Sequence, residues 1–74
     1  MMQDMITRIV NAETSFISDV IEQFGFTQEQ ATKILAVYKK YKIAKVDPVM
    51  GRVNIKHGAY WDKEPMSKAL EVQP

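Results

Sequence analysis

The residue best suited to acid–base chemistry in this chain is His57, the only histidine among 74 residues. An imidazole catalyst needs a second side chain to orient the ring and a nucleophile or a metal within reach. Asp62 is the carboxylate nearest to it in sequence, but a complete catalytic arrangement cannot be assembled around this pair. We therefore interpret His57 as a loop or surface residue, and we expect no catalytic residues and no enzymatic activity.

Metal and phosphate chemistry are also poorly supported by the sequence. The chain has no cysteine, which excludes thiolate metal ligands, thiolate nucleophiles and disulfides. With a single histidine, only an all-carboxylate metal site would remain, and the acidic residues are scattered along the chain. The segment GRVNIKHG lacks the glycine spacing and the following helix of a phosphate-binding loop. We expect no metal, no cofactor and no small-molecule substrate.

Protein binding is the function that the remaining residue types favour. Tyr60 and Trp61 are adjacent, and both types are enriched at interface hot spots. Three polar residues alternate along a predicted strand just before them and therefore share one face of it. The predicted partner-binding residues are Arg52, Asn54, Lys56, Tyr60 and Trp61. The alternative that stays open is that the two aromatic rings pack a hairpin onto the helices.

A second candidate surface is basic. The net charge is +1, but residues 1–26 sum to −3 and residues 27–46 to +4. A helix followed by a basic hairpin resembles the second half of a winged-helix domain, in which the helix enters a DNA groove and the wing touches phosphate. The nucleic-acid-binding residues that this resemblance implies are Lys39, Lys40, Lys42, Lys45, Arg52 and Lys56. Lysines near a helix C-terminus and on a hairpin edge are also expected for structural reasons alone.

The elements that must position these residues begin with a long amphipathic helix ending near Phe24. Its apolar residues recur at intervals of three and four, although Glu13 occupies a position that should be apolar. One continuous helix is favoured over two helices joined by a kink. About 20 residues form a rod of about 30 Å, as long as a small domain is wide, so part of the stripe is free for self-association. The residues predicted to associate, in a homodimer, are Met2, Met5, Ile6 and Ile9.

The segment FGFTQEQA predicts a tight corner between two helices. Gly25 suits the left-handed position that ends a helix, and Thr27 with Gln30 forms a capping box at the start of the next. The second helix is expected from Gln28 to about Tyr41. Its predicted inward face consists of Ala31, Ile34, Leu35, Tyr38 and Tyr41.

The rest of the chain predicts a hairpin and a short final helix. Residues 42–46 and 52–56 are β-type runs joined by a turn at Asp47-Pro48, with Gly51 supplying a positive φ, and the register of the first run is undetermined. Asp62 can cap a helix that ends near Val72. The predicted fold is a single α+β domain, residues 1–74, in the order α-α-β-β-α. With neither a signal peptide nor an apolar run of about 20 residues, we expect a cytoplasmic protein without membrane contact.

The run YKIAKVDPVMGRVNIKHGAYWDKEPMSKALE resembles small uncharacterised proteins encoded in phage and prophage genomes, in which a segment close to VKHGA and a short terminal helix recur. That resemblance implies a phage accessory protein that acts in a bacterial host cytoplasm by binding a host or phage protein, or nucleic acid. The sequence therefore predicts a small non-enzymatic interaction protein. The alternative is a winged-helix-like nucleic-acid-binding domain.

Overall fold

The computed structural model describes residues 2–72, which form helices around one two-stranded antiparallel sheet. In chain order the elements are α1 (Met2–Phe24), α2 (Gln28–Lys40), β1 (Ala44–Asp47), β2 (Arg52–Ile55), the single 3-10 turn η1 (Gly58–Tyr60) and α3 (Lys63–Ala69). This order confirms the predicted α+β fold, and α1 is continuous as expected. The turn η1 is not predicted by the sequence, and α3 ends at Ala69, somewhat before the expected Val72.

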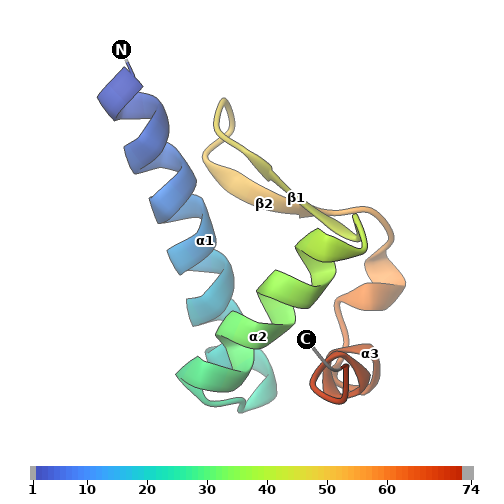
Figure 1. Cartoon of the computed structure of the whole chain (residues 1–74). Coiled ribbons are helices and arrows are strands. Elements are labelled where there is room, and N and C mark those ends of the chain that lie inside the picture. Colours follow the sequence, from blue (N-terminus) through green and yellow to red (C-terminus); the bar gives the residue numbers. More distant parts are fainter. Residues whose placement is uncertain (1, 73–74) are drawn as a thin grey trace.

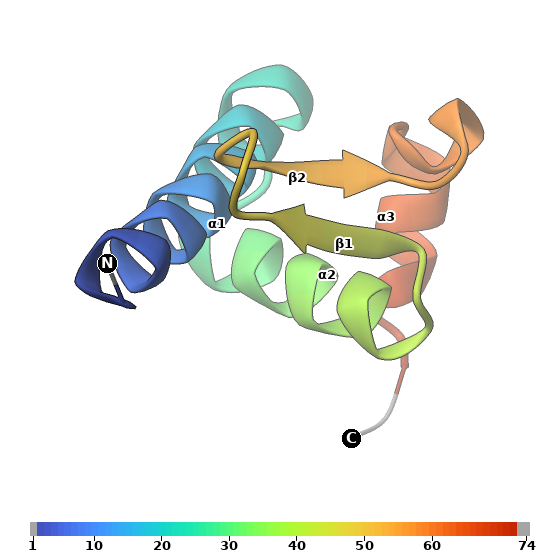
Figure 2. The same ribbon diagram turned by 90° about the horizontal axis from the view of Figure 1, so that it is seen from above.

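The two long helices and the hairpin enclose the core. In Figure 1, α1 and α2 diverge from the corner that joins them, and α3 lies beside α2 on the side away from α1. The hairpin runs across the helices from α1 towards α3 (Figure 2). From Asp4 onward, Ala12 is the first buried side chain of α1, so the N-terminal half of this helix extends beyond the core. The core consists of Phe16, Val20, Phe26, Ala31, Ile34, Leu35, Tyr38, Ala44, Met66 and Ala69.

The corner between α1 and α2 forms as the sequence predicts. Gly25 has a φ of 76°, and its N–H donates to the Ile21 carbonyl at 3.0 Å, which ends α1. The Gln30 N–H donates to Thr27 Oγ1, and the Thr27 N–H donates to Gln30 Oε1, so both bonds of the capping box are present. Phe26 lies between Gly25, which ends α1, and Thr27, which caps the start of α2, and its buried side chain anchors the corner to the core.

Glu13 occupies its unexpected position because it has a partner on α2. Its carboxylate forms an ion pair with the Lys39 ammonium at 2.5 Å. Both side chains are partly exposed, so the pair adds at most about 1 kcal/mol to stability. It nevertheless explains why the apolar stripe of α1 is interrupted without a kink in the helix.

The C-terminus of α2 is a Schellman motif that the sequence does not predict. The Ile43 N–H donates to the Tyr38 carbonyl at 2.8 Å, and the Lys42 N–H donates to the Lys39 carbonyl at 3.1 Å. Lys42 therefore adopts a φ of 59°, a position that usually holds glycine. The helix ends one residue before Tyr41, which is 56% exposed, so the prediction that Tyr41 faces inward is wrong. The other four predicted inward residues of α2 are buried.

Lys42→Gly is expected to raise the free energy of unfolding by about 0.5–1 kcal/mol. Glycine removes the Cβ clash of the left-handed region, and this gain exceeds the added entropy of the unfolded chain. Urea denaturation followed by circular dichroism measures the change. Lys42→Ala is the matched control, since it removes the charge but keeps the Cβ, and it should stay within about 0.5 kcal/mol of the parent. Equal effects of the two substitutions would contradict the strain at this position.

The hairpin register places Ala44 and Val46 on the face towards the helices, opposite Ile55 and Val53. The outward pairs are Lys45 with Asn54 and Asp47 with Arg52. In the turn, the Asp47 carboxylate accepts hydrogen bonds from two backbone N–H groups at 3.0 and 3.1 Å, and Gly51 has the expected positive φ of 70°. The turn chemistry is confirmed, and burial of the small Ala44 side chain sets the register that the sequence leaves open.

Candidate protein-binding surfaces

Trp61 lies half-buried against α1. Its ring makes edge contacts with Phe16 and Phe24, with centroid separations of 5.4 and 5.3 Å. Its indole N–H donates to Gln23 Oε1 at 3.1 Å. These contacts tie the segment after the hairpin to the first helix, and they match the interpretation in which the aromatic pair packs the fold.

Tyr60 is half-buried against α2, where it meets the fully buried Tyr38. The two rings lie edge to face with centroids 6.0 Å apart, and the Tyr38 hydroxyl donates to the Tyr60 carbonyl at 2.8 Å. Burial, with a smaller contribution from Tyr60, raises the pKa of Tyr38 to about 12. The Tyr38 hydroxyl is therefore a structural donor at physiological pH.

The three polar residues predicted beside this pair are exposed. On the outward face of β2, Arg52 Nε donates to Asn54 Oδ1 at 3.2 Å, and Lys56 follows the strand. Arg52 and Trp61 together line a cavity of about 250 Å³ between α1 and β2, whereas Asn54 and Lys56 are not among its lining residues. The structure thus brings only part of the predicted partner-binding set together.

His57 is exposed beside this segment, with its ring centroid 6.4 Å from that of Tyr60. Among residues 2–72, no three His, Asp or Glu side chains are grouped closely enough to hold a metal ion. The same described residues include no helix long and apolar enough to cross a membrane.

The structure does not bring the predicted basic residues together on one surface. Lys39, Lys42 and Lys45 line one groove of about 520 Å³, whose remaining lining is apolar. The apolar lining residues are Ile9, Ala44 and Val46. Lys40 instead lies over the exposed Tyr41 ring, 5.9 Å from its centroid. Arg52 begins β2 and Lys56 follows this strand, and neither residue lines this groove.

The N-terminal half of α1 and the hairpin tip come together at one end of the molecule (Figure 1), and both carry large exposed apolar side chains. We call these side chains the apolar end: Met5, Ile6 and Val10 of α1, with Val49 and Met50 of the turn, each more than half exposed. Of the predicted self-association residues, Met5 and Ile6 belong to it and Ile9 is half-buried, while the side chain of Met2 lies outside the described residues. The sequence analysis does not identify Val49 and Met50, although two large apolar residues in a hairpin turn are a usable signal.

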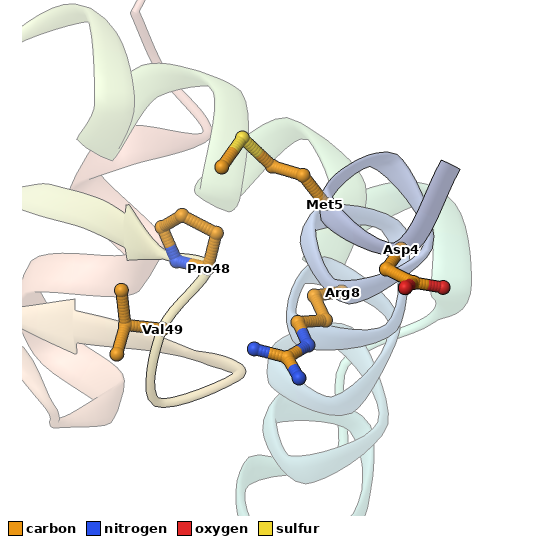
Figure 3. A pocket seen from close by; sticks show the side chains of 5 residues that line it. All are labelled: Asp4, Met5, Arg8, Pro48 and Val49. Atoms are coloured by element: carbon orange, nitrogen blue, oxygen red, sulfur yellow. The ribbon is translucent and has the colours of Figure 1, made fainter. Parts of the chain in front are cut away.

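Figure 3 shows how the helix and the turn meet at this end. Met5 and Arg8 of α1 face Pro48 and Val49 of the turn across a cavity of about 190 Å³, which Asp4 also lines. Apolar groups from two distant segments therefore form one surface, with an acidic and a basic side chain beside it.

No protein-family model, curated protein or solved structure matches this chain. Function is therefore inferred from the chemistry of its own surfaces.

Proposed function

We propose that the chain is a small non-enzymatic interaction protein that associates with a second copy of itself through the apolar end. The observation that carries the proposal is the exposure of its five large apolar side chains, from 53% for Val10 to 78% for Val49. Several large apolar side chains exposed near one another are costly in water and mark interaction sites in folded proteins. Burial against a partner removes this cost.

A second copy is the occupant that the chemistry of the surface supports. A chain of 74 residues builds a limited core, and self-association is an ordinary way for such a small domain to gain buried apolar area. In a two-fold dimer the same patch meets itself, so it must be complementary to its own copy. Asp4 and Arg8 satisfy this condition, since Asp4 of one copy can face Arg8 of the other beside Met5 and Val49.

Binding rather than catalysis is also the role that the resemblance of residues 41–71 to phage and prophage proteins supports. We propose that the dimer acts as an accessory protein whose other surfaces remain available to a protein partner. Tyr60 and Trp61 are half-buried and support the fold of each copy. The exposed residues Arg52, Asn54 and Lys56 are therefore the ones that would contact the protein partner.

Sedimentation equilibrium tests the dimer. We expect a mass near twice the 8.5 kDa of the chain at micromolar concentration. Ile6→Gln with Val10→Gln keeps good helix formers on the same helix face and should weaken dimerisation at least about a hundredfold, because it removes apolar contacts from both copies.

The matched control is Thr7→Gln with Asn11→Gln, which alters the exposed residues one position further along α1. This variant should dimerise like the parent. A parent chain that sediments as a monomer, or equal dimerisation of both double variants, would rule out self-association through this surface.

A further inference from the structure

The groove beside β1 lies along an open edge of the sheet. Its lining comes from α1, from the C-terminus of α2 and from β1, and none of it comes from β2. Among the described residues, β2 is the single strand paired with β1. The groove therefore follows the edge of β1 that faces away from the hairpin partner.

The ladder shows which backbone groups face this edge. The Lys56 N–H donates to the Ile43 carbonyl at 2.8 Å, and hydrogen-bonded positions alternate from there along an antiparallel pair. The backbone N–H and C=O groups of Lys45 therefore point towards β2, whereas those of Ala44 and Val46 point away from β2. Ala44 is buried at the inner end of the groove, whereas Val46 is half-buried, so the groups of Val46 form the accessible template on which an extended segment can add as a further strand.

The side chains of the groove define the chemistry of such a segment. Lys42 and Lys45 are exposed and form a basic rim, Lys39 beside them is paired with Glu13, and Ile9 and Val46 contribute to an apolar floor. Side chains alternate between the two faces of an added strand. Apolar residues would therefore lie on the floor, and the intervening residues would project on the face that carries Lys45.

We propose that this groove binds an acidic, extended segment of another protein, which adds beside β1 as a third strand. The segment alternates apolar and acidic residues over about four to six positions, since β1 itself is four residues long. This surface differs from the apolar end, so the proposal does not depend on self-association.

Nucleic acid is the competing ligand for a groove with a lysine rim. A phosphate backbone is bound through cationic contacts along its length, but here the Glu13 carboxylate already neutralises Lys39. The apolar floor offers nothing to phosphate, whereas the backbone edge at Val46 matches a peptide. The observations therefore favour a peptide over a nucleic acid.

A fluorescently labelled peptide of three Glu-Val repeats is the first probe, with binding followed by anisotropy. We expect saturable binding that weakens as salt is added. Two N-methylated forms provide the matched comparison, one methylated at the glutamate amides and the other at the valine amides. Only one set of amides can face β1, so one form should lose binding and the other should retain it.

Two proline variants test the edge from the protein side. Val46→Pro removes an N–H that faces the groove, and Val53→Pro removes the equivalent N–H from the outer edge of β2, because these residues are cross-strand partners. Val46→Pro should weaken peptide binding about tenfold or more, and Val53→Pro should leave it unchanged. Thermal melting checks that both variants fold.

Charge reversal keeps the test decisive if a proline variant does not fold. Lys45→Glu should weaken peptide binding about tenfold, while Lys56→Glu, which lies off the groove, should not. Failure of the peptide to bind, or equal effects of the two N-methylated forms, would overturn the proposal. Tighter binding of duplex DNA at the same lysines would also overturn it. Peptide binding by the Ile6→Gln/Val10→Gln variant separates this result from self-association.

Discussion

Trp61→Ala is expected to lower the free energy of unfolding by about 3 kcal/mol, the low end of the range for truncating a core aromatic residue, because the ring is half-buried. The ring contacts Phe16 and Phe24 and bonds Gln23, so its loss detaches the segment before α3 from α1. A domain of 74 residues has a total stability of about 4–11 kcal/mol. The variant should therefore unfold at much lower urea concentration, as followed by far-ultraviolet circular dichroism.

Tyr41→Ala is the matched control for the loss of an aromatic ring. Tyr41 is 56% exposed at the end of α2, and its truncation should cost less than about 0.5 kcal/mol. The comparison also distinguishes the two interpretations of Trp61 that the sequence leaves open. If Trp61 served mainly as an anchor for a partner, its truncation would leave stability close to that of Tyr41→Ala and would weaken binding instead.

The parts of the fold that the sequence predicts best depend on residues close together in the chain. Gly25, Thr27 and Gln30 act within one turn of their own helix ends, so their roles follow from residue type and spacing. The turn at Asp47 and the cap at Asp62 are similarly local. Each of these signals is strong because its hydrogen bonds do not depend on the rest of the fold.

The predictions that fail or stay open depend on contacts between distant segments. Glu13 meets Lys39 across 26 positions, which no local pattern reveals. The stop of α2 uses Lys42 in place of glycine, because the Schellman bonds and the hairpin together outweigh the strain of its positive φ. That stop also turns Tyr41 outward. Tertiary packing therefore overrides local preference at the junction of α2 and β1.

The candidate surfaces show the same division. Met5 and Ile6 could be identified from the length of the helical stripe, but the meeting of Met5 with Val49 requires the hairpin to fold back along α1. The sequence identifies the basic residues only as a group. In the structure, Lys39, Lys42 and Lys45 surround one apolar floor. These three lysines could be distinguished from the others only with the strand register, because the register decides which edge of β1 faces the groove.

Alkaline pH is expected to destabilise the folded chain through Tyr38. Burial raises its pKa from 10.0 in the unfolded chain to about 12 in the folded one, so the folded state holds the phenolic proton more tightly. The contribution of this proton to stability is complete below pH 10 and is lost as the pH rises to 12 and beyond. The loss by pH 12 should be about 2 kcal/mol.

Comparison with Tyr38→Phe isolates this contribution, because every other titrating group is common to both chains. Below pH 10 the variant should be less stable by about 1 kcal/mol, since the Tyr60 carbonyl loses its donor. At pH 12 the order should reverse, because phenylalanine has no proton to lose. Urea denaturation across this range measures both stabilities. Parallel curves for the parent and Tyr38→Phe would show that the buried hydroxyl is not the group whose ionisation opposes folding.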